Sequence, residues 1–353
     1  MIEVTLNENS FTRDLTVYLE NQIKINLSSS GVGLSLVLGF GAAYVCYYLS
    51  SVAKKPQLIT GSATLSEFLQ RYCPVVTETY YPTFWCWEAR VQTLLRPFIT
   101  TKPWVEYRNE LIETADGGNI SLDWNNNDDN ALYPVSATRP TILILPGLTG
   151  TSKESYILHM VKQSEILGYR SVVFNNRGVA GETLRTPRTY CAANTEDLET
   201  VIFHVQNTFP EAPLMAAGVS MGGQRQMFET LFNIDYVMQA KSIREFDERF
   251  TSVMFGYKTN ADYYKDASPY HKLKSIEVPV LCLNALDDVF SPAYAIPMQS
   301  AKQNPNVALL LTAHGGHIGF LEGIFPRRMT YMDRLFKQFI QAVFEHKDEL
   351  KSA

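Results

Sequence analysis

The sequence lacks the features that mark several specialised classes of protein. Its 353 residues contain no internal repeat and no low-complexity tract. Charged residues make up only 19% of the chain, the net charge is −5, and no basic cluster occurs, so nothing indicates a nucleic-acid partner. With a hydrophobic fraction of 46%, the composition is typical of a globular protein.

Cysteine is also scarce. The chain has five cysteines, an odd and scattered set, at Cys46, Cys73, Cys86, Cys191 and Cys282. Their spacing matches neither a disulfide framework nor a zinc site, so we interpret them as packing residues. No cluster of metal-ligating residues and no phosphate-binding glycine loop is present, and we therefore expect neither a metal nor a cofactor.

One segment has no charge at all. Residues 31–53, GVGLSLVLGFGAAYVCYYLSSVA, form a run of 23 residues without an acidic or basic side chain. About 20 such residues can cross a bilayer, and the tyrosines near the end followed by Lys54-Lys55 fit a membrane interface. The alternatives are a buried core helix and a cleaved signal peptide, but a signal peptide begins with basic residues, whereas residues 1–30 carry four acidic residues against two basic ones. We expect a tail over residues 1–30 and an uncleaved single-pass anchor over residues 31–53.

The sequence leaves undecided on which side of the membrane the following domain lies. Two basic residues precede the apolar run and three follow it nearby, a margin that favours a cytosolic domain. The glycosylation sequon at residues 119–121 would matter only in a lumen. We expect an endomembrane location with undecided orientation.

Residues 54–104 form a connecting segment rich in aromatic residues and proline. The aromatic residues of interest are Tyr80, Tyr81, Phe84, Trp85 and Trp87. They are either ordinary packing residues, or they lie at a lipid interface or over a groove for an acyl chain. The sequence leaves both interpretations open.

From residue 105 to residue 348, apolar runs alternate with helical stretches. Residues 105–124 predict two strands joined by a turn at Asp116-Gly117-Gly118. We expect further strands over 140–147, 169–178, 212–220, 278–285 and 306–312, and helices over 152–168, 194–209 and from about 326 to 347. This alternation predicts an α/β domain with a mostly parallel sheet and helices on both faces.

The sequence GVSMG, residues 218–222, has the G-x-S-x-G form of a nucleophile elbow and follows an apolar run. A serine hydroxyl becomes a nucleophile only when a histidine takes its proton and a carboxylate holds that histidine. In α/β-hydrolases the three follow in the order Ser, Asp or Glu, His, each at the end of a strand. We predict Ser220 as the nucleophile. A serine here argues against haloalkane or epoxide chemistry, and no histidine has Asp five residues later, as an H-x-x-x-x-D acyltransferase would require.

Two candidates exist for the acid and two for the base. Asp287 and Asp288 follow the predicted strand 278–285, and only Asp288 has a proline, Pro292, four residues beyond it, as is common in hydrolase acid loops. His314 and His317 follow the last predicted strand, and glycines surround His317. We predict Asp288 and His317 as the acid and the base.

An oxyanion hole needs two preorganised donors. One should be the amide of Met221, directly after the nucleophile, and the other should come from the loop PGLTGTSKESY, most simply the amide of Leu148. Arg177-Gly178 either supports this loop or is an ordinary strand end.

These motifs together resemble a known family. LPGLTGTSKESYI, VVFNNRG, AGVSMGG, LDDVFSP and GGHIGFLEG, behind an apolar anchor, are similar to the membrane-bound α/β-hydrolase-domain-containing phospholipases, closest to the subfamily of the third vertebrate member. The resemblance runs from the anchor to Gln224 and from about Arg225 to the C-terminus. It implies an α/β-hydrolase fold, Ser220, Asp288 and His317 as the triad, and no cofactor. It also implies hydrolysis of acyl esters of phosphatidylcholine with medium-length or oxidatively truncated chains.

The chain departs from this family after the elbow. Relatives have a longer stretch there, including the rest of the elbow helix and a core strand between the nucleophile and acid strands. Here Ser220 and Asp288 are 68 residues apart, a helix is plausible over residues 227–237, and TSVMFGY at 251–257 is the only strand-like run. We therefore predict one missing core strand, whose neighbours must pair directly or leave unpaired backbone groups that cost a few kcal/mol each.

Two hypotheses follow. The first is a membrane-anchored serine hydrolase that cleaves phospholipid acyl esters, and the second is a catalytically impaired variant that binds lipid or partners without catalysis. The separation of Asp288 from His317 distinguishes them: hydrogen-bond reach supports the enzyme, and more than about 5 Å counts against it.

Overall fold

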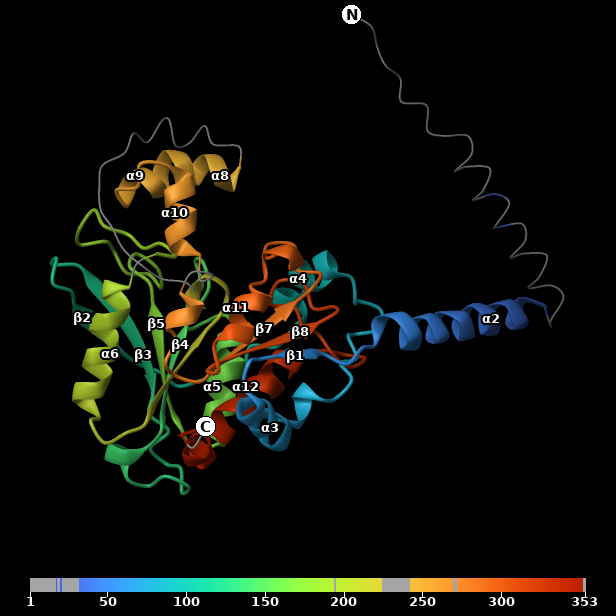
Figure 1. Ribbon diagram of the computed structural model, residues 1–353, viewed down its shortest axis with the longest axis horizontal. Coiled ribbons are helices and arrows are strands. Elements are labelled where there is room, and N and C mark those ends of the chain that lie inside the picture. Colours follow the sequence, from blue (N-terminus) through green and yellow to red (C-terminus); the bar gives the residue numbers. More distant parts are fainter. Residues whose placement is uncertain are drawn as a thin grey trace, which may run out of the picture. The chain divides into compact units, whose positions relative to one another are not determined.

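A computed structural model describes residues 17, 20, 32–193, 195–223, 242–268 and 272–351 of the chain, which divides into two compact units between Lys54 and Lys55 (Figure 1). Apart from residues 17 and 20, the predicted tail lies outside the described residues, as does the helix expected over 227–237.

The first unit is helical. Helix α2 (Val32–Tyr47) is followed directly by a π-helix, η1 (Tyr48–Val52). The described part of the chain contains no single helix with both the length and the apolar character needed to cross a bilayer.

The second unit contains eight described strands and most of the described helices. The strands are β1 (Gln57–Ile59), β2 (Arg108–Glu113), β3 (Asn119–Asn125), β4 (Thr141–Leu145), β5 (Arg170–Asn175), β6 (Leu214–Gly218), β7 (Val280–Ala285) and β8 (Val307–Thr312). The helices are α3 (Ala63–Tyr72), α4 (Ala89–Ile99), α5 (Ser155–Ile166), α6 (Glu196–Thr208), α8 (Ile243–Phe246), α9 (Ser252–Met254), α10 (Asn260–Ala267), α11 (Met298–Gln303) and α12 (Tyr331–Lys351).

The strands form two mixed sheets instead of one mostly parallel sheet. The larger has the order β2-β3-β5-β4-β6 and the smaller β1-β8-β7. The pairs β4–β5, β4–β6 and β7–β8 are parallel, whereas β1–β8, β2–β3 and β3–β5 are antiparallel. The expectation of a mostly parallel sheet was wrong because antiparallel strands lie at the outer edges. These are the predicted hairpin, β2–β3, on the larger sheet and β1, which was not predicted, on the smaller one.

Helices cover both faces of the larger sheet. Strand β4 is buried along its whole length, and its alternate side chains divide between two clusters. Ile142 and Ile144 pack with Ile157 of α5 and Ile340 of α12, whereas Leu143 packs with residues of α6 on the other face. This period-two division is the expected consequence of a strand covered on both sides.

The break between the sheets falls where the core strand was predicted to be missing. Strands β6 and β7 do not pair with each other, and within the described residues no strand lies between them. On β6, Ala216 and Gly218 are exposed, which is unusual for a strand next to the nucleophile of such a fold. Of the two outcomes expected for the missing strand, the described residues therefore show open strand edges.

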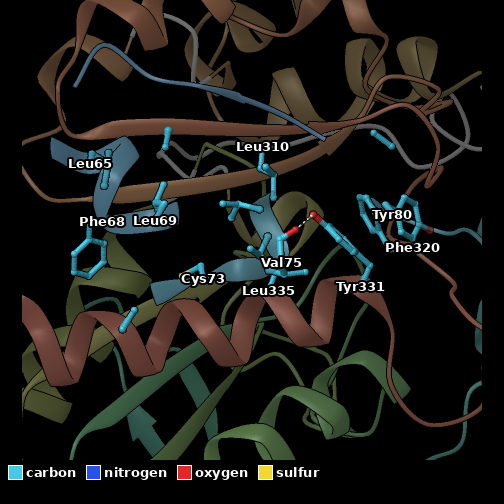
Figure 2. Packing of buried hydrophobic residues seen from close by; sticks show 14 residues of the cluster. Leu65, Phe68, Leu69, Cys73, Val75, Tyr80, Leu310, Phe320, Tyr331 and Leu335 are labelled. Atoms are coloured by element: carbon cyan, nitrogen blue, oxygen red, sulfur yellow. Dashed lines mark hydrogen bonds between the residues drawn. The ribbon is translucent and has the colours of Figure 1, made fainter. Parts of the chain in front are cut away.

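Helix α12 joins the two sheets through side chains instead of strand pairing. Its Phe336 and Ile340 pack in the core of the larger sheet, while Tyr331 and Leu335 pack in a cluster with β8 and α3. Figure 2 shows the second cluster, in which the Tyr331 hydroxyl donates a hydrogen bond of 2.8 Å to the carbonyl of Val75. The helix thus packs against both sheets and connects them where their strands do not pair.

Two expected boundaries differ from the structure. The run TSVMFGY is not a strand, because its first residue, Thr251, ends the π-helix η5 (Asp247–Thr251) and the next three residues form the short helix α9. The closing helix begins at Tyr331, five residues later than expected, after Thr330 accepts a hydrogen bond from the amide of Asp333 at the start of the helix.

Candidate active site

Ser220 stands at a sharp turn at the end of β6. Its φ is +54°, a left-handed conformation that is rare for a residue other than glycine. It begins the 3₁₀ turn η4 (Ser220–Gly223), and its side chain is exposed. The backbone strain and the exposed hydroxyl are those of a nucleophile elbow.

The loop after β4 approaches this serine closely. A side-chain carbon placed on Gly147 would lie 3.2 Å from Cβ of Ser220, so only glycine fits comfortably. The amide of Gly147 donates to the Tyr156 hydroxyl at 3.1 Å, which ties the loop to α5. Tyr156 was not predicted from the sequence, because its partner is nine residues away across a loop.

The structure brings Ser220, His317 and Asp288 together. Oγ of Ser220 lies 2.8 Å from Nε2 of His317, and Nδ1 of His317 lies 3.0 Å from Oδ2 of Asp288. Both distances are within hydrogen-bond reach. The separation of Asp288 from His317 therefore falls on the side expected for an enzyme.

Asp288 is held as a carboxylate. Burial alone would raise its pKa, since its side chain is only 8% exposed. The hydrogen bond with His317 and the amides of Phe290 and Ser291, which donate to Oδ1 at 2.7 and 3.1 Å, outweigh burial and lower the pKa of Asp288 below its usual range. An ionised Asp288 can fix the tautomer of His317 that presents a bare Nε2 to the serine.

Helix α4 positions the histidine turn. The backbone amide of His317 donates to Thr93 Oγ1 at 2.9 Å, and that hydroxyl donates to the carbonyl of Ala89 at 2.7 Å. A side-chain carbon on Gly316 would lie 2.3 Å from the Ala89 carbonyl oxygen, so the turn packs directly against the helix backbone. Thr93 was not predicted from the sequence, which offers no signal for a contact over more than 200 residues.

The second aspartate and the second histidine pair with each other. Nδ1 of His314 lies 3.0 Å from Oδ2 of Asp287, whose other oxygen accepts from the amide of Gly316 at 2.9 Å. The ring of Trp87 packs edge-on against His314, with centroids 5.3 Å apart. This pair joins the loop after β7 to the turn that carries His317, next to the Asp288–His317 contact.

Arg177 has neither of the two roles considered for it, support of the loop after β4 or an ordinary strand end, because it joins two other elements. It is almost fully buried and binds Asp116 and Asp197, each at 2.6 Å. Asp116 lies in the β2–β3 turn and Asp197 in α6, so Arg177 joins the hairpin to that helix. Gly118 leaves the space that the guanidinium fills, because a side-chain carbon there would lie 2.4 Å from Nη1.

Metal-ligating side chains do not gather in the part of the chain that the structure describes: it holds no group of three or more His, Cys, Asp or Glu placed around a common point. Three of the four cysteines of the second unit are buried, and burial raises the pKa of Cys73 to about 12 and that of Cys282 to about 11. A thiol with a raised pKa is protonated and unreactive at neutral pH.

Comparison with known proteins finds relatives that match the chain from end to end. Phospholipase ABHD3 of Bos taurus is 58% identical over 410 aligned positions, covering 100% of this chain and 100% of that protein. Phospholipase ABHD3 of Homo sapiens is 59% identical over 408 positions, covering 99% of this chain and 100% of that protein. Because this chain has 353 residues, at least 57 positions of the 410-position alignment have no residue here.

Among solved structures, the Pyrococcus furiosus esterase Pf2001 is similar with a TM-score of 0.47 and 16% identity, over 71% of this chain and 96% of that chain. No family model matches the chain.

Proposed function

We propose that this chain cleaves phospholipid acyl esters through Ser220, His317 and Asp288. The premise is that the chain belongs to the ABHD3 family of phospholipases and is a carboxylic ester hydrolase. The observation that carries the proposal is the continuous chain of hydrogen bonds from Ser220 Oγ through His317 to Asp288. No other described histidine lies against the hydroxyl of an exposed, strained serine.

The geometry gives each side chain a step in the reaction. Ser220 Oγ attacks the ester carbonyl carbon while its proton passes to Nε2 of His317. When the tetrahedral intermediate collapses, the bond from the acyl carbon to the glycerol oxygen breaks, and His317 returns the proton to that oxygen. Water then attacks the acyl-enzyme with His317 again as the base, releasing the fatty acid and regenerating Ser220.

The amides of Leu148 and Met221 are the proposed oxyanion donors. Met221 directly follows the nucleophile. In the loop after β4, the amide of Gly147 donates to Tyr156 and that of Thr149 donates to Tyr190 at 3.2 Å, so we propose the amide of Leu148, between them, as the donor of this loop. Removing one such donor typically costs a hundredfold or more in turnover.

An apolar substrate fits the surroundings of the triad. The side chain of Leu148 is exposed on the oxyanion loop, and the ring of Phe290, also exposed, packs edge-on against His317 with centroids 4.8 Å apart. Exposed apolar groups beside a nucleophile favour a substrate that contributes an acyl chain. We propose phosphatidylcholine with a medium-length or oxidatively truncated chain, the class implied by the family resemblance.

We also propose that residues 31–53 anchor the protein in a membrane. The segment is free of charge, and eight of its large apolar side chains between residues 36 and 49 are exposed, namely those of Leu36, Val37, Leu38, Phe40, Tyr44, Val45, Tyr47 and Leu49. Resistance of the full chain to alkaline carbonate extraction, lost when Leu38 and Phe40 are both changed to Arg, is the expected result.

Labelling with a fluorophosphonate probe tests the catalytic proposal. The full chain in detergent should react, and Ser220→Ala should not, because the probe modifies only an activated serine. Unlabelled wild-type protein is then incubated with phosphatidylcholine that carries a medium-length chain, and release of the fatty acid is measured. Absence of labelling in wild-type protein that is folded by circular dichroism would contradict the proposal and favour the non-catalytic alternative.

A further inference from the structure

Helix α4 presents its apolar side outward and its polar side inward. Gln92 and Arg96 are buried, whereas Leu94 is 68% exposed and Phe98 is 85% exposed. Val91, Leu94 and Phe98 recur at the three- and four-residue spacing that places them on one helix face. A helix at the surface of a soluble domain normally has the opposite arrangement.

The inward polar residues contact other parts of the fold. Gln92 Oε1 accepts from the amide of Leu321 at 2.9 Å, and its amide group donates to the carbonyl of Trp87 at 3.1 Å. The guanidinium of Arg96 lies over the ring of Tyr156, 5.6 Å from its centroid. These contacts fix which face of α4 points outward, so the apolar exposure is set by the tertiary structure.

A second exposed apolar segment adjoins the end of α4. Trp85, Phe98 and Phe325 line one groove of about 310 Å³, and Phe325 is 80% exposed. The indole of Trp85 donates to the carbonyl of Ile324 at 2.8 Å, which fixes both residues. We call the combined surface the apolar platform; it consists of Trp85, Val91, Leu94, Phe98, Ile324 and Phe325.

Basic residues border the apolar platform. Arg90, Lys102, Arg327 and Arg328 are exposed and belong to the same two segments of chain. The acidic residues there are Glu88, which caps α4, and Glu322, which pairs with Arg334 at 2.8 Å. Aromatic side chains rimmed by arginine and lysine match the interfacial layer of a phospholipid bilayer, where the rings enter the acyl boundary and the cations meet phosphate.

The apolar platform is coupled to the proposed active site. Thr93, between the buried Gln92 and the exposed Leu94, accepts the backbone amide of His317, so the catalytic turn rests on the inner side of the same helix. A surface that contacts the outer side of α4 therefore lies one helix diameter, about 10 Å, from the histidine.

We propose that the apolar platform is a second membrane contact of this protein, distinct from residues 31–53, and that it docks the catalytic unit on the phospholipid surface from which the substrate is drawn. The inference rests on the proposed function for the identity of the substrate. The contact itself requires only a bilayer, so the two can fail separately.

Site-directed quenching tests the contact directly. The full chain carrying Cys46→Ser and Phe98→Cys, labelled with an environment-sensitive fluorophore, is reconstituted in vesicles of phosphatidylcholine with 20% phosphatidylserine, roughly the charge of an anionic leaflet. The control places the label at Phe203→Cys on α6, another exposed phenylalanine (63%) far along the chain. Headgroup-proximal nitroxide lipids should quench the label at position 98 at least about threefold more than that at position 203.

Equal, weak quenching at both positions would overturn the proposal. So would excimer emission from a pyrene label at position 98 without quenching by lipid, since this would show that a second copy of the chain covers the platform. Neither reading depends on catalysis.

A kinetic test separates docking from chemistry. The double variant Phe98→Gln, Phe325→Gln should hydrolyse vesicle phosphatidylcholine about tenfold more slowly than wild type, because two buried aromatic contacts with lipid are lost. Its fluorophosphonate labelling and its hydrolysis of a soluble short-chain ester should stay within about twofold, and Phe203→Gln should change neither activity.

Unchanged vesicle hydrolysis in the double variant would overturn the docking role. If wild type hydrolyses neither substrate, the proposed function has failed, and the quenching result alone decides the contact.

Discussion

The two aspartates that follow β7 are adjacent and chemically identical, yet the fold gives them different partners. Asp288 meets His317, which lies against Ser220, whereas Asp287 meets His314 and the amide of Gly316. Side chains of consecutive residues point in different directions, so the two carboxylates reach different parts of one turn. In this arrangement Asp288 contacts His317, the proposed base, whereas Asp287 contacts the turn that carries His317.

Replacing each aspartate by asparagine separates these roles. We expect Asp288→Asn to lower kcat on a soluble ester by about 10⁴-fold, because an amide no longer enforces the tautomer of His317. Asp287→Asn should lower kcat by about tenfold or less, since a shifted turn costs orientation but leaves the acid in place. Thermal unfolding of both variants is the control, and a larger loss for Asp287→Asn would reverse the assignment.

Arg177 has a structural role. Buried between two carboxylates, it holds the hairpin turn against α6. The hydrogen bond from Arg177 holds the pKa of Asp116 far below the ordinary value of 3.8. A group whose pKa is lower in the folded state stabilises the fold above its unfolded pKa, and this contribution disappears as the pH falls through the folded pKa.

The pH dependence of stability should therefore change in Asp116→Asn. At pH 7 the variant should be less stable than wild type in urea unfolding, because the charge partner of Arg177 is gone. The difference should persist down to about pH 4 and then shrink as the pH falls below 3.8, where unfolded wild type takes up a proton on Asp116. A difference that stays constant between pH 7 and pH 3 would show that Asp116 titrates normally.

At the scale of elements, the turn after β8 is the most constrained part of the site. Gly315, Gly316, Ile318 and Phe320 all have positive φ, and the turn is pressed against the backbone of α4. Such a turn places His317 by packing on both sides, and the hydroxyl of Thr93 adds one directional contact. Strain of this kind is retained where the surrounding structure overdetermines it.

Gly316→Ala should therefore damage catalysis more than stability alone explains. The new methyl group meets the Ala89 carbonyl, so the turn must move, and we expect a loss of about 1–3 kcal/mol in the free energy of unfolding and about 10²-fold in kcat. Gly117→Ala is the matched control, since Gly117 also has a positive φ (+78°) but nothing within 4 Å of the added carbon.

The control should lose stability without losing activity once folded. Equal kcat in the two variants would show that His317 does not depend on the contact between the turn and α4.

At the scale of the whole molecule, the sheet is broken beside the nucleophile. Among the residues that the structure describes, β6 pairs only with β4 and β7 only with β8, while α12 packs against both sheets. The proposed triad spans this break, because Ser220 follows a strand of the larger sheet and His317 and Asp288 follow strands of the smaller one. The relative orientation of the two sheets therefore decides the Ser220–His317 distance.

Hydrogen exchange should reveal the break. Peptides covering β6 and β7 should exchange faster than those covering β4 and β8, which have partners on both sides, because an edge strand opens at a lower cost. Strand β2, the other edge of the larger sheet, is the internal reference. If β6 and β7 are protected as well as β4, the two strands have found a partner in solution that closes the break.

Sequence alone determined what local chemistry can specify. The apolar runs predicted the strands from β2 to β8, and the G-x-S-x-G motif marked Ser220. The glycines around His317 and the proline after Asp288 selected the histidine that the structure places beside Ser220 and the aspartate that it places beside that histidine. The short interval after the elbow predicted one missing core strand, and the described residues contain no strand between β6 and β7. These features are readable because periodicity, turns and loop spacing depend on neighbouring residues.

Only the tertiary structure decided the rest. The pairing of β1 with β8, the bond from His317 to Thr93, the pairing of Asp287 with His314 and the outward apolar face of α4 all join residues far apart in the chain. A strand of three residues or a single threonine has no periodicity to identify it. The face that α4 buries depends on the partners of Gln92 and Arg96, which the fold brings from elsewhere, and hydrophobic spacing alone would have placed Leu94 and Phe98 inside.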